Sequence, residues 1–226
     1  DWGSAREPLA SISYKRKLSV SKDLHAIRRT RMLLAGALGY EFDENRAVFG
    51  IREGFRKSQP AEGLVFIIGA SCSSRLWSPE AWKALTRKAV EHGHAVTLVW
   101  GSDEERDRAL LIHDGLEGVL VTDERESIEE VTRTLANAEG VVGVDTGFTH
   151  ISSALVVPTV SLHGPTSPEK TGSVGDWSGR LEPSIDCHPC EERVCPLNAS
   201  NPPCLEGISP DRVWEELSRV LRSQTA

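Results

Sequence analysis

Four residues at one predicted strand-to-helix corner have side chains suited to binding phosphate or sugar hydroxyls. In the stretch GVDTGFTH, Asp145 and Thr146 end an apolar run, Gly147 follows, and His150 comes three residues after the glycine. A carboxylate accepts hydrogen bonds from hydroxyl groups, a glycine lets a ligand approach the backbone, and the first amides of a helix favour an anion. His150 could instead be an ordinary structural histidine. The corner is therefore a candidate site for a charged or hydroxyl-rich ligand.

Two further loops carry polar side chains after predicted strands. The loop SCSSRLWS holds Ser71 and Arg75 just before a predicted helix, where a guanidinium could bind a phosphate through two hydrogen bonds. The loop GSDEE holds Glu105, which could accept hydrogen bonds from both hydroxyls of a ribose. Each loop also has a simpler interpretation, because loop residues often cap helices and the helix dipole favours an acid in the first turn.

The elements that would position these loops alternate regularly after residue 63. Apolar, β-rich runs predict strands within 64–70, 94–100, 118–122, 140–144 and 158–164. Helices are predicted at 78–93, from 103, at 127–138 and after 147, and Ser127 with Glu130 forms a capping box in the third of these. The pattern predicts a doubly wound, parallel α/β sheet, in which ligands bind beyond the carboxyl ends of the strands.

The segments on either side of this series are less regular. Residues 23–39 predict a helix that ends at Gly39, and residues 41–62 predict a short strand and a linker that ends near Pro60. At the other end, SPDRVWEELSRVLRS predicts a closing helix with Ser209 as its N-cap.

Composition and charge narrow the class of protein. The chain has 226 residues, 39% of them hydrophobic, which is enough for one large or two modest cores. No apolar run is long enough to predict a membrane span and the start lacks the layout of a signal peptide, so a cytoplasmic location is predicted. The net charge of −7 divides into +5 over residues 1–35 and −12 over the rest. The basic segment could attract an anionic partner or be a solvated helix, whereas the acidic body disfavours nucleic acid.

Cysteine spacing raises the question of a structural metal. Four cysteines form the pattern C-x2-C-x4-C-x8-C, at Cys187, Cys190, Cys195 and Cys204. This spacing could ligate a structural metal ion, and simple reduced thiols are the alternative. A disulfide is less favoured in a reducing cytoplasm.

These motifs together resemble a known family. The segment VVGVDTGFTHISSALVVPTVSLHGPTSPEKTG resembles the D-T-G-x-x-H region of bacterial lipopolysaccharide heptosyltransferases, and the similarity extends to WSPEAWKAL and to GSDEERDRA. The opening, DWGSAREPLAS with VSKDLHAIRRTRMLLAGALGY, is most similar to heptosyltransferase I. The resemblance implies a two-domain GT-B fold, with the tail of an acceptor-binding N-terminal domain over 1–60 and a Rossmann-like donor domain over 61–226.

The resemblance also implies an activity. Family members transfer L-glycero-D-manno-heptose from ADP-heptose, with inversion, to Kdo of lipid A, and they do so without a metal or other cofactor. This chemistry implies a peripheral location at the cytoplasmic face of the inner membrane. Because the family aspartate that deprotonates the acceptor has no counterpart here, we expect the chain to lack the start of the N-terminal domain, so that alone it could bind donor without transferring it.

The implied roles fall on the residues singled out above. Glu105 corresponds to the ribose-binding acid and Asp145 to the contact with heptose hydroxyls, while Arg75 lies near a family lysine that neutralises the donor phosphate, in a loop one residue shorter than in the family. The remaining candidate donor contacts are Ser71, Thr146, Gly147 and His150. Candidate contacts to the anionic acceptor are Arg6, Lys22, Arg28 and Arg29.

Three alternative functions stay open at this point. Heptosyltransferase II, which uses a heptose acceptor, is the closest, because similar sequences carry a comparable cysteine-rich segment. A nucleotide-sugar epimerase shares the architecture but would use UDP. A non-catalytic nucleotide-sugar-binding protein would bind the donor and stay inactive in any context.

Overall fold

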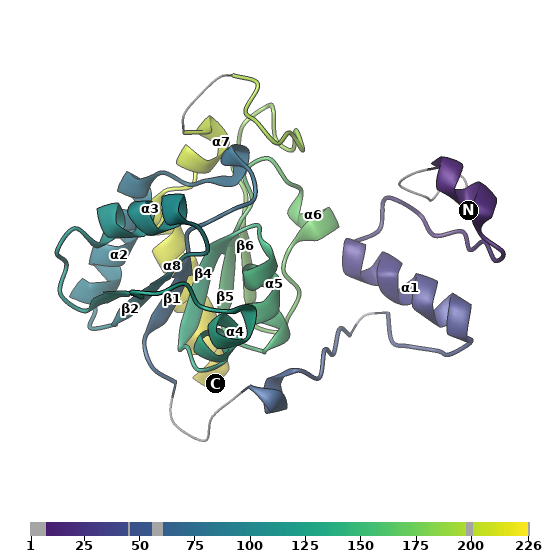
Figure 1. The fold of residues 1–226 in the computed structure, drawn as a ribbon, viewed down its shortest axis with the longest axis horizontal. Coiled ribbons are helices and arrows are strands. Elements are labelled where there is room, and N and C mark those ends of the chain that lie inside the picture. Colours follow the sequence, from purple (N-terminus) through teal and green to yellow (C-terminus); the bar gives the residue numbers. More distant parts are fainter. Residues whose placement is uncertain (1–7, 45, 56–60, 198–200, 226) are drawn as a thin grey trace. The chain divides into compact units, whose positions relative to one another are not determined.

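The computed structural model describes residues 8–44, 46–55, 61–197 and 201–225 of the chain (Figure 1). The chain folds into two compact units. The smaller unit comprises Asp1–Ala47 with Glu169–Thr171, and the larger comprises Val48–Pro168 with Gly172–Ala226. The larger unit therefore includes part of the segment that the sequence assigns to a first domain ending at residue 60, and that domain assignment stays a prediction.

The smaller unit is built on one helix. The helix α1 spans Ala26–Leu38 and ends at Gly39, whose positive φ of 75° is the left-handed conformation that glycine adopts without strain. This end confirms the predicted stop. A short 3-10 helix, η1, spans Pro8–Ser13. Arg28 forms an ion pair with Glu44, and the Arg31 guanidinium donates to the carbonyl oxygen of Arg46 at 2.7 Å, so the segment after α1 is tied back to the helix.

The larger unit contains a six-stranded parallel sheet in the order β3-β2-β1-β4-β5-β6. Its strands are β1 Leu64–Ile67, β2 Val96–Val99, β3 Val119–Val121, β4 Gly140–Val144, β5 Thr159–Leu162 and β6 Ser178–Leu181. The five predicted strands and the doubly wound α/β class are confirmed. Strand β6 was not predicted, because its sequence, SGRL, has no apolar run and only alternate residues are buried.

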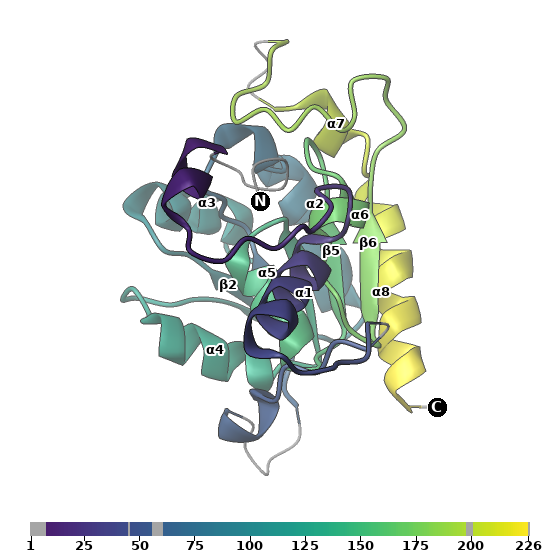
Figure 2. The same cartoon turned by 90° about the vertical axis from the view of Figure 1, so that its right-hand side faces the viewer.

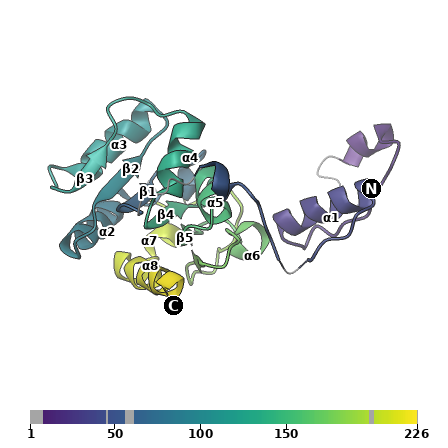
Figure 3. The ribbon, with the colours of Figure 1, turned by 90° about the horizontal axis from the view of Figure 1, so that it is seen from below.

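Helices cover both faces of this sheet (Figure 3). The longer ones are α2 Pro79–Glu91, α3 Asp103–His113, α4 Ile128–Ala136, α5 Gly147–Ala154 and α8 Pro210–Thr225. Short elements are η2 Arg52–Gly54, η3 Ser73–Arg75, α6 Pro168–Thr171 and α7 Pro203–Glu206. The two predicted caps are confirmed: Ser127 and Glu130 form the capping box, and Ser209 accepts from the Arg212 amide. Ser78 caps α2 by accepting from the Ala81 amide.

Two apolar layers hold the helices to the sheet. Helices α2, α3 and α8 bury one face, where Trp77 and Trp82 are fully buried with ring centroids 5.0 Å apart. Helices α4 and α5 bury the other face. Helix α8 runs alongside β6 (Figure 2) and packs on β4, where a Cβ on Gly140 would lie 3.2 Å from Leu217. The glycine lets this helix approach the sheet closely.

One predicted element is wrong. Residues 41–44, 46–55 and 61–62, the described part of the predicted strand-and-linker segment, contain no strand, and the 3-10 helix η2 lies there instead. Gly50 has a positive φ of 69°, which is incompatible with a regular strand, and a strand also needs a neighbour to pair with. Among the described residues, no helix is both long and apolar enough to span a bilayer.

Candidate functional site

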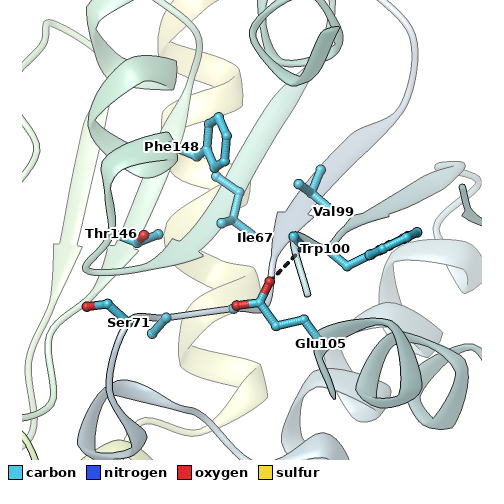
Figure 4. Close-up of a pocket in the computed structure, with 10 residues that line it drawn as sticks. Ile67, Ser71, Val99, Trp100, Glu105, Thr146 and Phe148 are labelled. Carbon is cyan, nitrogen blue, oxygen red and sulfur yellow. Dashed lines mark hydrogen bonds between the residues drawn. The ribbon is translucent and has the colours of Figure 1, made fainter. Parts of the chain in front are cut away.

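A pocket of about 170 Å³ lies at the carboxyl ends of β1 and β2, beside the loop that follows β4 (Figure 4). Three predicted site residues, Ser71, Glu105 and Thr146, line it, and each follows a different strand. The other lining residues are Ile67, Gly69, Ala70, Val99, Trp100, Gly101 and Phe148. The pocket thus has apolar walls with one carboxylate and two hydroxyls, which suits a flat ring that carries polar groups.

The Glu105 carboxylate is fixed against the backbone of two glycines. Its Oε2 accepts a hydrogen bond from the Gly101 amide at 2.7 Å (Figure 4), and a Cβ on Gly69 would lie 2.1 Å from its Oε1. The side chain of Ser102 caps α3 by accepting from the Glu105 amide at 3.3 Å, so Glu105 lies in the first turn of that helix. Helix start and glycine contacts together hold the carboxylate at the pocket wall, with further lone pairs left to accept hydrogen bonds.

A second group of charged residues gathers around Asp145, directly after β4. The Asp145 side chain is 5% exposed. The Arg75 Nη1 donates to the Asp145 carbonyl oxygen at 3.1 Å and lies 3.5 Å from its Oδ2. The His150 Nε2 lies 3.2 Å from Oδ1, one turn into α5. Loops from β1 and β4 therefore bring Arg75, Asp145 and His150 together, as expected for residues at one edge of a parallel sheet.

Asp145 stays ionised despite its burial. Burial by itself would raise the pKa of this carboxyl, but hydrogen bonds from His150 and Thr166 and the nearby His163 and Arg75 more than offset it, and the net pKa is lowered. Ionised, the carboxylate only accepts hydrogen bonds, so its open positions suit ligand hydroxyls.

The start of α5 supplies backbone donors between these two groups. Thr146 is the N-cap in an extended conformation, and its hydroxyl forms no capping hydrogen bond, although it lines the pocket. Gly147 opens the helix, and beyond its own helix and chain neighbours no described atom lies within 4 Å of the Cβ position it leaves empty. The first amides of a helix carry partial positive charge and favour an anion. All seven predicted residues of this site lie on the loops and helix starts at the carboxyl edge of the sheet.

The predicted acceptor contacts lie in the smaller unit. Arg6 lies outside the described residues. Lys22 is exposed and Arg28 is paired with Glu44. The Arg29 Nε is buried and has no hydrogen-bond partner within the part of the chain that the structure describes. Their contact with an acceptor stays a prediction.

The four cysteines interact with one another: burial, and then the nearby Cys187, Cys190 and Cys195, raise the pKa of the Cys204 thiol to about 11. All four cysteines lie within the described residues, where no group of three or more His, Cys, Asp or Glu side chains is placed to hold a metal ion. Cys204 is buried in α7 against Gly164, whereas Cys187 is exposed and Cys190 and Cys195 are half-buried on the preceding loop. The possible structural metal site therefore stays a prediction.

Two sets of residues near the site were missed. His163 and Thr166 lie behind Asp145, and the sequence offered no signal beyond a polar end to β5. The loop over 190–195 also packs on the Ser71 loop: the Ser74 hydroxyl donates to the Glu192 carbonyl oxygen at 2.6 Å. No local pattern predicts a contact between residues so far apart in the chain.

Comparison with known proteins identifies the family. The sequence model of glycosyltransferase family 9 (heptosyltransferase) matches residues 1–200. The chain belongs to this family. The family 9 assignment confirms the resemblance noted in the sequence.

Individual relatives support the assignment to family 9. Lipopolysaccharide heptosyltransferase 1 of Pseudomonas aeruginosa is 37% identical over 98% of this chain and 66% of that protein. The solved structure of E. coli heptosyltransferase WaaC with ADP covers 97% of this chain and 64% of that chain, at 31% identity and a TM-score of 0.81. The same enzyme with ADP-2-deoxy-2-fluoro heptose gives a TM-score of 0.77, at 31% identity, over 97% of this chain and 63% of that one. The chain thus spans slightly less than two thirds of each of these relatives, and its fold is of the GT-B heptosyltransferase type.

Proposed function

We propose that this chain provides the ADP-heptose site of an inverting heptosyltransferase that adds L-glycero-D-manno-heptose to Kdo of lipid A. The observation that carries the proposal is the joint presence, at one sheet edge, of the Glu105 pocket and the Asp145 cluster, which are linked through Thr146 next to Asp145. Family 9 membership and the E. coli relative solved with ADP and with a fluorinated ADP-heptose support it.

The nucleoside would occupy the pocket. Apolar side chains such as Val99 and Phe148 offer a surface for adenine, and the Glu105 carboxylate would accept hydrogen bonds from the vicinal ribose hydroxyls. Because Glu105 already accepts from the Gly101 amide, its carboxylate needs no rearrangement to receive them.

The diphosphate and sugar would lie at the start of α5. The amides after Thr146 would donate to phosphate oxygens, and the Arg75 guanidinium would stabilise the charge that develops on ADP as the glycosidic bond breaks. The Asp145 carboxylate would accept hydrogen bonds from heptose hydroxyls. We thus assign donor binding and leaving-group stabilisation to residues of this chain. Transfer also requires a base that deprotonates the acceptor, and we assign that role to none of these residues.

The acceptor would meet a basic surface. Kdo and lipid A carry carboxylates and phosphates, and residues 1–35 carry a net charge of +5. We assign Lys22, Arg28 and Arg29, with Arg6, as candidate contacts, and a peripheral location at the cytoplasmic face of the inner membrane follows from such an acceptor.

Calorimetric titration of the chain with ADP-heptose, ADP and UDP tests the donor assignment. We expect ADP-heptose and ADP to bind in preference to UDP, and Glu105→Ala to weaken both adenine nucleotides. Asp145→Asn should reduce the affinity for ADP-heptose relative to ADP, since only the sugar nucleotide reaches that carboxylate. Glu104→Ala, on the exposed side of the same helix turn, is the matched control. Preference for UDP, or equal losses in Glu104→Ala and Glu105→Ala, would refute the assignment.

A further inference from the structure

A fully buried set of polar side chains lies behind Asp145, on the side of β5 and β6. Ser161, His163, Thr166 and Ser173 are each at most 2% exposed. Polar groups buried to this degree cost free energy unless they are hydrogen-bonded, so each of these side chains should have a hydrogen-bond partner.

These side chains form one continuous chain of contacts. The Ser173 and Ser161 hydroxyl oxygens lie 3.0 Å apart, and Ser161 Oγ lies 3.0 Å from the Nε2 of His163. The Nδ1 of His163 lies 3.3 Å from the Thr166 hydroxyl oxygen. Thr166 in turn hydrogen-bonds to the Asp145 carboxylate. The chain therefore starts between β5 and β6 and ends on the carboxylate of the site.

The last member of the chain sets which way Thr166 and His163 donate. An ionised carboxylate only accepts, so Thr166 donates to Asp145, and the Thr166 oxygen is then available to accept from His163 Nδ1–H. A neutral imidazole has one donor, so Nε2 can then only accept. The Ser161 hydroxyl lies 3.0 Å from Nε2 and 3.3 Å from the Gly179 carbonyl oxygen, and in this arrangement its one proton points to Nε2, the closer acceptor. The Ser161 oxygen can accept from Ser173. In the opposite arrangement Thr166 would donate to His163 and could not donate to Asp145.

The surroundings of His163 keep the ring neutral, as this arrangement requires. Burial lowers the pKa of His163 to about 4, and it outweighs the opposing effect of Asp145. His150 and Arg180 lower this pKa further, and Glu182 raises it. At neutral pH the ring therefore carries a single proton, which can sit on only one of its nitrogens.

We propose that His163 and Thr166 are positioning residues that orient the Asp145 carboxylate through this buried relay, with the His163 proton on Nδ1. Arg75 and His150 hold the carboxylate from the ligand side, and Thr166 holds it from behind. With its rotamer fixed, the carboxylate presents its remaining lone pairs to a sugar hydroxyl in one direction. The effect on ligand binding rests on the proposed function, whereas the relay itself does not.

The tautomer of His163 tests the relay directly. Nitrogen NMR of the ¹⁵N-labelled chain at neutral pH distinguishes a protonated Nδ1 from a protonated Nε2, with the His163 ring assigned through its backbone. We expect the Nδ1–H form. An Nε2–H form, or a charged ring, would overturn the proposal. This measurement needs neither a ligand nor a substitution.

The effect on binding is tested with Thr166→Val, which removes the hydroxyl and keeps the side-chain shape. We expect the affinity for ADP-heptose to fall about tenfold, the order of one hydrogen bond to a charged group, with the affinity for ADP unchanged. Thr166→Ser should restore most of it. The matched control is Thr86→Val in α2, where an equally buried hydroxyl has no hydrogen-bond partner among the described residues.

The outcomes separate the two proposals. If the unsubstituted chain binds ADP-heptose and Thr166→Val leaves the ratio of ADP-heptose to ADP affinity unchanged, the positioning role is wrong. If the unsubstituted chain does not bind ADP-heptose, the proposed function is refuted, and the His163 tautomer still decides whether the relay exists.

Discussion

Gly69→Ala should displace the Glu105 carboxylate while leaving the fold intact. A Cβ at this position would lie 2.1 Å from Oε1, 2.2 Å from Cδ and 2.6 Å from Oε2 of Glu105, all far closer than atoms can approach. The obstructing atoms are the end of a flexible side chain, so the carboxylate rather than the backbone must move. It would then lose its hydrogen bond from the Gly101 amide, 2.7 Å long in the structure, and its place at the pocket wall.

The expected magnitude follows from the hydrogen bonds at stake. A hydrogen bond to a charged group contributes about 1.5 to 3 kcal/mol, and a carboxylate held against both ribose hydroxyls would make up to two. Loss of one such bond would lower the affinity for ADP roughly 10- to 150-fold, and loss of both would lower it further. The free energy of unfolding should change by about 1 kcal/mol or less, because the strain is relieved by a side-chain rotation.

Calorimetry with ADP, combined with urea unfolding, measures both effects. Glu105→Ala removes the obstructing carboxylate, so adding Gly69→Ala to it should cost no further affinity, and the two substitutions should be strongly non-additive. Gly54→Ala controls for the loss of glycine itself, because among the described residues no atom beyond its chain neighbours lies within 4 Å of its Cβ position. Additive losses of ADP affinity, or a Gly69→Ala variant that binds ADP normally, would refute the role of Glu105.

Three further predictions follow from the contacts described. Arg75→Ala should weaken ADP about tenfold and leave adenosine unaffected in the same titration, because only ADP carries phosphates; equal losses would place Arg75 outside the phosphate site. His163 should make the protein less stable in mild acid, because its pKa falls from 6.5 to about 4 on folding. Between pH 6.5 and about 4 the unfolded state therefore binds a proton that the folded state does not. The free energy of unfolding should fall by about 3 kcal/mol as the pH is lowered through this range. Urea titrations of His163→Gln should lose most of that pH dependence, and an unchanged slope would contradict the assignment. Leu217→Ala in α8 should reduce the free energy of unfolding by about 2 to 5 kcal/mol, because this leucine is fully buried against Gly140; a loss below about 1 kcal/mol in urea would show that the helix is held differently.

Local sequence patterns predicted the sheet because its strands are short β-branched runs. The strands β1, β4 and β5 are buried throughout, and buried parallel strands are apolar on both faces, which is a strong signal. The need for an apolar run and for a neighbouring strand also explains why β6 was missed and why the strand predicted within 41–62 is wrong. Strand β6 has the weak sequence SGRL and forms because β5 offers it a partner, whereas the segment over 41–62 has apolar residues but finds no partner among the described strands.

The site was predictable as a set of loops and not as a set of contacts. Strand order places the loops after β1 and β4 side by side, which allows Arg75 to reach Asp145, yet nothing local in either loop indicates that the two strands are neighbours. The close approach of Glu105 to Gly69 and the relay from Ser173 to Asp145 likewise join residues that are far apart in the chain. Such contacts depend on the tertiary arrangement, which cannot be predicted from the periodicity and spacing of residues in the sequence.

A crystal structure of this chain with ADP-heptose would test the central claim most directly. We expect the ribose hydroxyls within hydrogen-bonding distance of the Glu105 carboxylate, the diphosphate at the start of α5 beside Arg75, and a heptose hydroxyl on Asp145. A sugar nucleotide bound at another edge of the sheet, or in this pocket with the sugar toward Glu105 and the base toward Asp145, would contradict it.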